Sequence, residues 1–206
     1  MKVLVGFESS GITRDAFLRG GHDAMSCDLL DTEIPGPHYK GDGFDVIDYP
    51  WDLAIFHPEC THLSVSGALH HEAKRFDGRQ QAGAALFMRV VRRSAHIPRV
   101  AIENPVCIMS SLYRKPDQII QPHEFGHDAS KTTCLWLKGL SLLVPTLHIA
   151  PRIVDGKRRW ANQTDSGQNK LTPSEDRWKD RSRTYQGIAN AFADQWGRAA
   201  QMEIAA

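Results

Sequence analysis

Short apolar segments alternate with helical segments along the first half of this chain. Four of them, residues 3–7, 23–28, 52–56 and 99–102, have the length and composition of buried strands. Strands that are separated by helices pair in parallel, carry helices on both faces of the sheet and gather ligands at their carboxyl ends. The sequence therefore predicts an α/β fold with a mostly parallel sheet between helical layers.

The segments between these strands carry helix and loop signals. Residues 12–18 have a helical pattern that stops at Gly20 and Gly21, and residues 78–95 repeat apolar side chains every four positions. Residues 32–50 are rich in glycine, proline and aspartate, so we expect mostly loop there. One apolar stripe near the C-terminus predicts a helix that docks on the body of the fold: Ile188, Ala191, Phe192, Trp196 and Ala199.

Composition favours one compact unit without a strong overall charge. The chain has 206 residues, 41% of them hydrophobic, and a formal net charge of +1. A near-neutral chain lacks the overall electrostatic signature of a nucleic-acid-binding protein, so any basic surface has to be local. Residues 151–183 supply one, because nine lysines and arginines outnumber five acids there.

Cysteine usage and hydropathy indicate a cytoplasmic protein. Four scattered cysteines form no Cys-x-x-Cys pair, which is typical of reduced thiols: Cys27, Cys60, Cys107 and Cys134. The first apolar run is interrupted early by Glu8, which disfavours a signal peptide, and no apolar segment approaches the roughly 20 residues that cross a bilayer. We therefore expect no membrane partner.

The turn at residues 8–11 lies between the first strand and a helix. It is not the Gly-x-Gly-x-x-Gly of dinucleotide-binding proteins, so it either binds a cofactor or caps the helix through Ser9 or Ser10. Asp28 ends the second strand about twenty residues further on, where an acid can accept both hydroxyls of a ribose. The alternatives are an exposed loop aspartate for Asp28, and either an adenine contact or a turn aspartate for Asp42.

Cys60 lies in a proline-containing turn directly after the third strand. A cysteine in this position is either a nucleophile, favoured by the turn amides and nearby histidines, or a small buried hydrophobic residue. Zinc binding by His57, Cys60 and His62 is disfavoured, because a closed site needs a fourth ligand and no second pair at metal spacing follows. We therefore expect no structural metal.

The fourth strand ends in Glu103-Asn104-Pro105. A carboxylate at the end of a buried strand is costly unless it is paired or partly protonated, and a protonated carboxyl can donate a hydrogen bond to a ring nitrogen. The alternative is a glutamate that caps a helix with Pro105 in its first turn. With Cys60 on a neighbouring strand, the thiol and the acid favour chemistry on an aromatic ring.

In the order of these motifs the chain resembles the DNA cytosine-C5 methyltransferase family, in a short form found in bacteriophage and prophage genomes. The resemblance covers nearly the whole chain, and Pro-x-Cys followed by Glu-Asn-Pro is its most specific part. The motifs that carry it are Phe7-Glu-Ser-Ser-Gly11, Asp28, Gly41-Asp42, Pro58-Glu-Cys60, Glu103-Asn104-Pro105, Leu171-Thr-Pro173 and Gly187-Ile-Ala-Asn-Ala191.

The resemblance implies a Rossmann-like S-adenosylmethionine-dependent methyltransferase fold with a minimal target-recognition insertion. Cys60 would add to C6 of a cytosine rotated out of DNA, Glu103 would protonate N3, and Asn104 would orient Glu103. Lys131 stands where the family carries an Arg-x-Arg motif that contacts cytosine O2. The implied contacts to S-adenosylmethionine are Phe7, Glu8, Ser9, Ser10, Gly11, Asp28, Asp42, Pro58, Asn190 and Ala191. The expected contacts to DNA are Ser64 and, from the basic segment, Arg158 and Arg159.

The expected division of the chain has three segments, and two alternative functions stay open. Residues 1–142 would form the catalytic domain, 143–170 a short target-recognition segment, and 171–206 a C-terminal motif and helix that packs on the catalytic domain. One alternative keeps the same site but transfers a modified one-carbon or carboxymethyl group, or acts on a pyrimidine nucleotide, and nothing in the sequence separates it from methyl transfer to DNA. The other is a catalytically inactive module that binds S-adenosylmethionine or DNA, which Lys131 and Glu59 inside the nucleophile motif leave open. The oligomeric state is not indicated.

Overall fold

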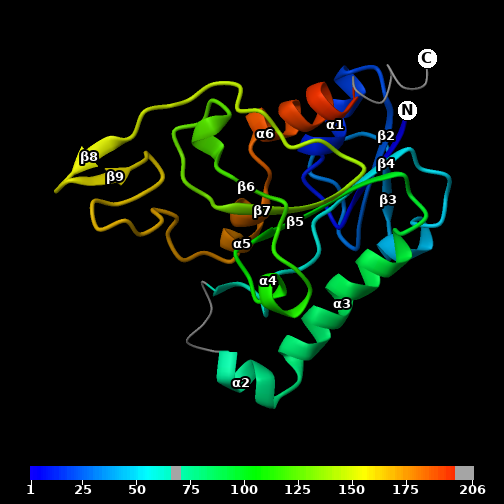
Figure 1. Ribbon diagram of the computed structural model, residues 1–206, viewed down its shortest axis with the longest axis horizontal. Coiled ribbons are helices and arrows are strands. Elements are labelled where there is room, and N and C mark those ends of the chain that lie inside the picture. The colour runs from blue at the N-terminus through cyan, green and yellow to red at the C-terminus, as the bar shows by residue number, and fades with distance from the viewer. Residues whose placement is uncertain (66–70, 198–206) are drawn as a thin grey trace.

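A seven-stranded sheet runs through the centre of the computed structural model, which describes residues 1–65 and 71–197 (Figure 1). Its strands lie in the order β3-β2-β1-β4-β5-β7-β6. The bounds of the strands are β1 Lys2–Gly6, β2 Asp23–Asp28, β3 His38–Lys40, β4 Leu53–Phe56, β5 Arg99–Pro105, β6 Gln118–Ile120 and β7 Thr133–Lys138. A separate two-stranded sheet consists of β8 Arg152–Val154 and β9 Lys157–Arg159.

Helices connect the strands and cover the sheet. The bounds of the α-helices are α1 Ile12–Arg19, α2 His71–Phe76, α3 Arg79–Arg93, α4 Met109–Leu112, α5 Arg177–Ser182 and α6 Gln186–Ala191. Short 3-10 turns lie at η1 Gly43–Asp45 and η3 Pro122–Glu124, and α6 continues into the π-helical turn η4 Phe192–Trp196.

Strand β7 is antiparallel to the six other strands of the large sheet. Strands β3, β2, β1, β4 and β5 pair in parallel, β7 pairs antiparallel with β5, and β6 pairs antiparallel with β7. This strand order with a reversed β7 is the topology of S-adenosylmethionine-dependent methyltransferases. The predicted fold class is confirmed.

Alternate residues of the central strands build two cores, one on each face of the sheet. Val3, Val5, Leu53 and Ile55 belong to the core beneath α1, α6 and η4. The residues between them in sequence point the other way, and side chains of α3 join them in the second core: Leu4, Ala54, Phe56, Phe87 and Val90. Because both faces are covered, the strands are apolar throughout instead of alternating with polar residues, which is why they were recognisable in the sequence.

Glycines end α1 and begin α3, the two main crossover helices, and the stop at Gly20 and Gly21 agrees with the prediction from the sequence. Helix α1 ends at Gly20, and Gly21 follows with a φ of 78°. Gly78 caps the start of α3 with a φ of 81°. The left-handed region of φ is costly for residues with a side chain, so glycine fixes these helix boundaries.

The predicted C-terminal helix docks on the α1 side of the sheet. Ile188, Ala191, Phe192 and Trp196 are buried in that core, and the rings of Phe192 and Trp196 stack with centroids 4.6 Å apart. The fifth residue of the predicted stripe, Ala199, lies outside the described residues.

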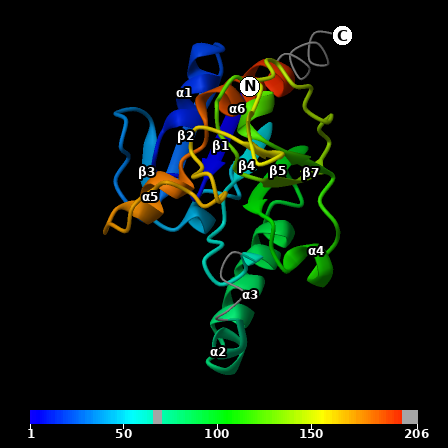
Figure 2. The same cartoon turned by 90° about the vertical axis from the view of Figure 1, so that its left-hand side faces the viewer.

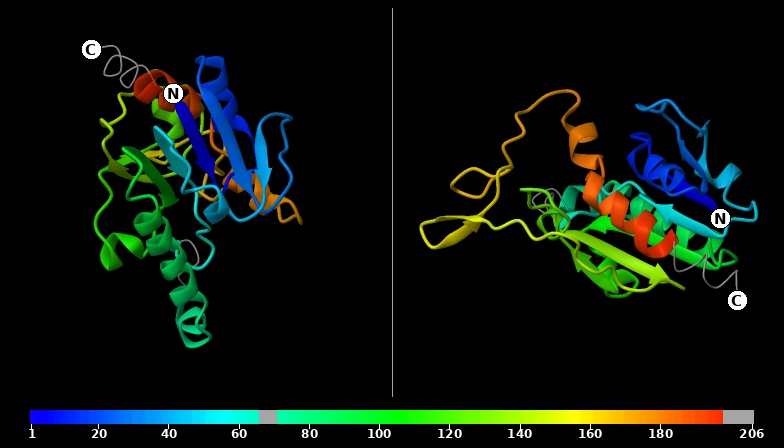
Figure 3. Two further views of the ribbon diagram at one scale, coloured as in Figure 1. Left: turned by 90° about the vertical axis from the view of Figure 1, so that its right-hand side faces the viewer. Right: turned by 90° about the horizontal axis from the view of Figure 1, so that it is seen from above.

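Two elements project from the body of the molecule. The β8–β9 hairpin lies far from the large sheet, on the left in Figure 1 and again in the right-hand view of Figure 3, and turns through Asp155 and Gly156, both with positive φ. Helix α2 and the first half of α3 extend away from the sheet (Figure 2). The hairpin falls within the predicted target-recognition segment, residues 143–170.

The segment predicted to be mostly loop, residues 32–50, contains β3 and η1. Strand β3 is only three residues long and lies at the sheet edge, so it carries no periodic pattern that a sequence could reveal. Among residues 1–65 and 71–197, no helix is both long and apolar enough to cross a membrane.

Candidate active site

Four of the turns that carry candidate residues lie at one edge of the sheet. Strands β2, β1, β4 and β5 are parallel neighbours, so their carboxyl ends face the same way. The turn at residues 8–11, Asp28, Cys60 and Glu103 follow or end these strands. In open α/β sheets this edge is where ligands bind.

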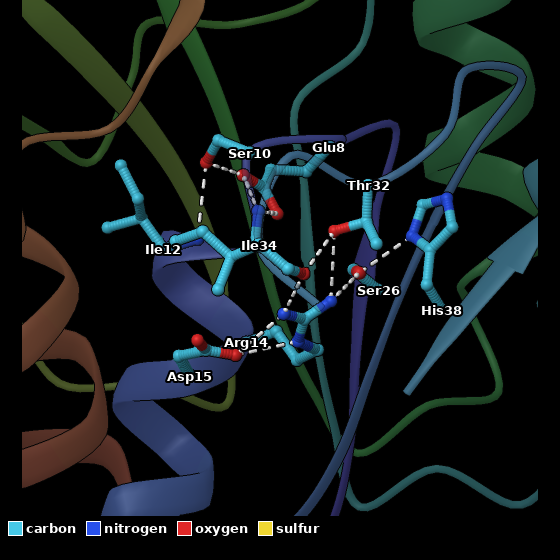
Figure 4. Close-up of polar contacts among 10 residues, drawn as sticks. Glu8, Ser10, Ile12, Arg14, Asp15, Ser26, Thr32, Ile34 and His38 are labelled. Carbon is cyan, nitrogen blue, oxygen red and sulfur yellow. Dashed lines mark hydrogen bonds and ion pairs between the residues drawn. The ribbon is translucent and has the colours of Figure 1, made fainter. Parts of the chain in front are cut away.

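The turn after β1 is organised by the carboxylate of Glu8. This buried side chain accepts hydrogen bonds from the Ser10 hydroxyl and from the N–H of Gly11, the latter at 3.0 Å (Figure 4). The Ser10 oxygen in turn accepts a bond from the N–H of Ile12 at 3.2 Å. The sequence-based alternative of Ser9 or Ser10 as helix N-cap is therefore wrong: the N-cap is Gly11, with a φ of 78°, and Glu8 supplies the negative group at the start of the helix.

Three acids gather around Cys27, the residue before Asp28. Burial raises the pKa of the Cys27 thiol to about 11, a backbone hydrogen bond from Phe7 opposes this, and the charges of Asp28, Asp42 and Glu8 raise it further. The chain also packs closely here, because a Cβ on Gly43 would lie 3.0 Å from the ring of Phe7 and 3.3 Å from Cys27 Sγ. Four predicted cofactor residues thus converge: Phe7, Glu8, Asp28 and Asp42.

Asp28 and Asp42 each stabilise a turn with one carboxylate oxygen. Asp28 Oδ1 accepts a hydrogen bond from the N–H of Leu30 at 2.9 Å, and Asp42 Oδ1 accepts one from the N–H of Phe44 at 3.0 Å. Asp28 is half-buried and Asp42 is exposed. An Asx turn uses one oxygen of a carboxylate, so each retains acceptor capacity for a ligand hydroxyl or amine.

Arg14, a residue that sequence analysis missed, ties the loop after Asp28 to helix α1. Its guanidinium is fully buried and donates hydrogen bonds to Ser26 Oγ at 3.2 Å, Thr32 Oγ1 at 3.1 Å and the carbonyl of Ile34 at 2.8 Å (Figure 4). It also pairs with Asp15 at 2.8 Å. A buried guanidinium needs such complete pairing, so Arg14 makes the loop and the helix one unit. This unit borders the acid cluster, which consists of Glu8, Asp28 and Asp42.

Two further observations show how tightly this loop is held. The N–H of Glu33 donates to the carbonyl of Ser9 at 2.8 Å, which links the loop directly to the first turn. A Cβ on Gly36 would lie 2.7 Å from the guanidinium carbon of Arg14. The only sequence signal for Arg14 was a charged residue on the apolar side of a short helix, beside Thr13 and Phe17.

The nucleophile turn, residues 57–64, first continues the hydrogen bonding of β4 with β1 and then forms main-chain hydrogen bonds within itself. The N–H of His57 donates to the carbonyl of Gly6 at 2.9 Å, and the carbonyl of Cys60 accepts the N–H groups of Leu63 and Ser64, both at 2.9 Å. Cys60 is half-buried. Burial and the charge of Glu103 raise its pKa to about 11, while the charge of Lys131 lowers it, so the thiol is protonated at neutral pH.

Glu103 lies on β5 beside this turn and is held in place by two neighbours. Its Oε2 lies 3.1 Å from Nδ1 of His57. Burial opposes ionisation of Glu103, but the hydrogen bond and charge of His57, the charge of Lys131 and a bond from Thr133 outweigh it and lower the pKa of Glu103. Asn104 donates from Nδ2 to the carbonyls of Pro58 and Glu103, each at 2.9 Å, which joins the two strand ends.

Lys131 faces both Glu103 and Cys60 from the segment before β7. Burial lowers the pKa of its ammonium, and the charges of Glu103 and Cys60 act in the opposite direction. The ammonium donates to the carbonyls of Ser182 at 3.4 Å and Arg183 at 3.0 Å. The chain after α5 is thereby drawn over the acid, and the space left beside Glu103 and Lys131 is a cavity of about 10 Å³, about the volume that one water molecule requires.

The structure does not bring Asn190 and Ala191 to this edge. Asn190 is exposed on α6 and its side chain accepts bonds from Arg19 at 3.2 Å and Gln186 at 2.9 Å. Arg19 is the last residue of α1, far from the turn at residues 8–11 that begins the helix. Ala191 is buried in the core.

The residues suggested for DNA contact lie in two different places. Ser64 is buried and forms a β-bridge with Cys107 next to the nucleophile turn. Arg158 is exposed on β9, and Arg159 donates to the carbonyl of Asp165 at 2.9 Å within the projecting hairpin region. Among the described residues, no group of three His, Cys, Asp or Glu side chains is arranged to hold a metal ion.

Comparison with known proteins finds similarity to solved structures. No family model matches the sequence, and no curated protein does. An E. coli prophage protein assigned as a DNA modification methyltransferase is similar with a TM-score of 0.49 and 18% identity, over 75% of this chain and 56% of that one. The Entamoeba histolytica methyltransferase EhMeth is similar with a TM-score of 0.48 and 14% identity, over 72% of this chain and 56% of that one. The chain spans little more than half the length of either protein.

Proposed function

We propose that this protein transfers a methyl group from S-adenosylmethionine to C5 of cytosine in DNA. The observation that carries the proposal is the meeting of Cys60, Glu103 and Lys131, which come from three separate elements and shift one another's pKa values. A thiol, an acid and a cation that lie close enough to feel one another's charge suit covalent chemistry on a pyrimidine ring. They lie at the edge of a methyltransferase-type sheet that also carries the acid cluster.

The acid cluster fits S-adenosylmethionine better than a nucleotide cofactor with phosphates. Glu8, Asp28 and Asp42 act together on Cys27, so this end of the sheet is negatively charged. Glu8 also accepts the N–H of Gly11, the N-cap of α1, and so places a carboxylate where nucleotide-binding folds bind phosphate. Carboxylates here would repel phosphates but would accept bonds from ribose hydroxyls and an ammonium group. When bound, S-adenosylmethionine supplies an electrophilic methyl group next to a cation-attracting surface.

Cys60 and Glu103 would perform the first chemical step on the base. The thiol sulfur of Cys60 forms a bond to C6, and its S–H proton passes to Glu103, whose lowered pKa keeps it ionised and able to accept the proton. Electrons of the C5–C6 double bond move through the ring to N3, and Glu103 passes the proton on to N3. Lys131 stabilises the developing thiolate, because its charge lowers the pKa of Cys60. The ring then carries electron density at C5, where the methyl group is accepted.

The same residues would release the product. The C5 proton leaves to water and Cys60 is expelled as a thiolate, which restores the C5–C6 double bond. The proton on N3 then returns through Glu103 to the sulfur of Cys60. Asn104 keeps the two strand ends in register during both steps, since its amide joins Pro58 to Glu103. Because the ring must enter a site that the chain after α5 covers, we expect a base rotated out of the duplex and a movement of that segment.

DNA would approach over the projecting β8–β9 hairpin. Its two short strands carry four basic residues, which suits contact with phosphates: Arg152, Lys157, Arg158 and Arg159. So short a recognition segment supports binding of a short site or of a strand form instead of a long specific sequence.

Covalent trapping on DNA that contains 5-fluorocytosine tests the proposal. With S-adenosylmethionine labelled on its methyl group, fluorine at C5 blocks proton loss, so the protein should remain attached to labelled DNA, and Cys60→Ser should abolish the adduct. The mass of the adduct also identifies the transferred group, which separates plain methyl from carboxymethyl transfer. No adduct with single-stranded or duplex DNA of random sequence would refute the proposal.

A further inference from the structure

Residues 152–170 form one folded arm that contains the β8–β9 hairpin (Figure 1). Arg152 donates from Nη2 to the carbonyl of Gln163 at 2.6 Å. Arg159 donates from Nε to the carbonyl of Asp165 at 2.9 Å. Because these bonds tie the loop after β9 to the hairpin, a partner that binds the hairpin acts on the arm as a whole.

The side-chain amide of Asn162 joins this arm to the body of the molecule. Its Oδ1 accepts the N–H of Ser130 at 2.9 Å, and its Nδ2 donates to the carbonyl of Ser130, also at 2.9 Å. Two residues in an antiparallel pair of strands exchange both bonds in the same way, so the amide stands in for a strand partner. Close by, the ring of Trp160 stacks on that of His123 with centroids 4.1 Å apart.

The same amide reaches a second segment, the chain after α5. Burial raises the pKa of the Tyr185 phenol, and a hydrogen bond with the side chain of Asn162 lowers it. A hydrogen bond that lowers the pKa of a phenol is one that its oxygen accepts, so Asn162 donates the second proton of its Nδ2 to Tyr185. Both N–H groups of the amide and its oxygen are then engaged by residues outside the arm.

These contacts hold two walls of the proposed base site. Ser130 directly precedes Lys131, and both Lys131 and Tyr185 line the cavity beside Glu103. We propose that Asn162 is a positioning residue that holds Lys131 and Tyr185 in a fixed relation to DNA bound on the arm.

The role of this joint rests on the proposed function, because only then does the arm carry DNA and the cavity receive a base. A displacement of about 1 Å at a reacting centre can cost about a hundredfold in rate. The basic side chains of the arm do not depend on the Asn162 amide. The joint should therefore act on the rate of the reaction and not on the affinity for DNA.

Amide hydrogen exchange tests the joint in the free protein. Asn162→Ala removes the acceptor of the Ser130 N–H, which should exchange at least about fivefold faster. Asn169→Ala is the matched control, because it removes an exposed amide of the same arm, whose oxygen accepts the N–H of Leu171 at 2.8 Å. Exchange at Ser130 that is equal in the two variants would overturn the inference, whatever reaction the protein catalyses.

Single-turnover trapping on 5-fluorocytosine DNA tests the role of the joint. Neither alanine variant changes the charge of the arm, so both should bind DNA with the wild-type affinity and the wild-type salt slope. At saturating DNA, Asn162→Ala should form the adduct at least about tenfold more slowly, and Asn169→Ala at the wild-type rate. A loss confined to affinity, or equal rates in the two variants, would contradict a positioning role.

Tyr185→Phe separates the joint from a general loosening of the fold. It removes the hydroxyl that accepts from Asn162 and keeps the ring, so adduct formation should slow. The double variant should be no slower than Asn162→Ala alone, because both changes break one contact. Losses that multiply would mean that Tyr185 acts without Asn162 and would remove it from the inference's two walls, which overturns the inference as stated. A wild-type protein that binds DNA but never forms an adduct would refute the proposed function, while hydrogen exchange at Ser130 would still decide whether the joint exists.

Discussion

Asn104 donates a hydrogen bond from its side-chain amide to the main-chain carbonyl of Pro58 at 2.9 Å. A second bond of the same length reaches the carbonyl of Glu103. The amide thus joins the end of β5, which carries the acid, to the turn that carries Cys60. Further along the chain, main-chain bonds from Val65 to Val106 and from Ile108 to Leu63 join the same two segments, so Asn104 fixes the part of the contact nearest to Cys60 and Glu103.

Replacing this amide should loosen the site and the fold together. Asn104 is 1% exposed, and Asn104→Ala leaves the Pro58 carbonyl without its donor, which typically costs about 1–3 kcal/mol. We expect urea denaturation to show that loss, and trapping on 5-fluorocytosine DNA to fall at least about tenfold. Asn169→Ala, which removes an exposed amide in a loop, is the matched control. Equal stability of the two variants would contradict the role of Asn104 as a clamp.

The reactivity of Cys60 should report the charges around it. Its pKa is about 11, so the thiolate is scarce at pH 8 and alkylation by iodoacetamide should accelerate about tenfold per pH unit up to that value. Removing the negative charge with Glu103→Gln lowers the pKa and should speed alkylation at pH 8. Removing the positive charge with Lys131→Met raises the pKa and should slow it.

Two variants make the alkylation experiment specific. Cys60→Ser shows how much of the signal comes from the three buried cysteines. Lys131→Arg keeps the charge, so it should react at nearly the wild-type rate even though its geometry differs. If Lys131→Met and Lys131→Arg slow alkylation equally, Lys131 acts through packing against the chain after α5 and not through its charge.

Much of the fold could be predicted because the central strands are buried on both faces. The predicted strand at residues 23–28 coincides with β2, and the one at 52–56 differs from β4 by one residue. The repeat of apolar residues every four positions within 78–95 consists of Ala82, Leu86 and Val90, and the apolar face that it predicts is partly wrong, since Ala82 is exposed. Leu63 packs instead against Gly83, 3.2 Å from where a Cβ would lie, and a glycine on the packed face gives no apolar signal in the sequence.

The site could be predicted only where single residues carry the chemistry. Cys60 and Glu103 stand at recognisable strand ends, whereas the partner of Glu103, His57, follows from the register between β4 and β5. Arg14 was missed for the same kind of reason, because its partners lie on the loop after β2 and a buried arginine looks like a surface residue in sequence. Asn190 resembled a family motif, but its helix directs it toward Arg19.

The acid cluster should set the affinity for S-adenosylmethionine. Asp28→Asn removes one carboxylate acceptor, and loss of a charged hydrogen bond of about 1.5–3 kcal/mol corresponds to at least about tenfold weaker binding in equilibrium dialysis. Asp31→Asn is the matched control, because Asp31 is an exposed acid on the same loop that pairs with Lys40. If the two variants bind equally well, the ribose contact lies elsewhere along the edge.

The hairpin should contribute part of the salt dependence of DNA binding. Arg158 is exposed on β9, so Arg158→Gln removes one phosphate contact and should lower the slope of log affinity against log salt by about one, uniformly across DNA sequences. Arg92→Gln makes the same change at an exposed position in the last turn of α3, away from the hairpin, and should leave the slope unchanged. A slope that falls equally in both variants would mean that the two arginines contribute only through overall charge. A slope that falls in Arg92→Gln alone would place the DNA on the α3 face and remove the hairpin from the binding surface.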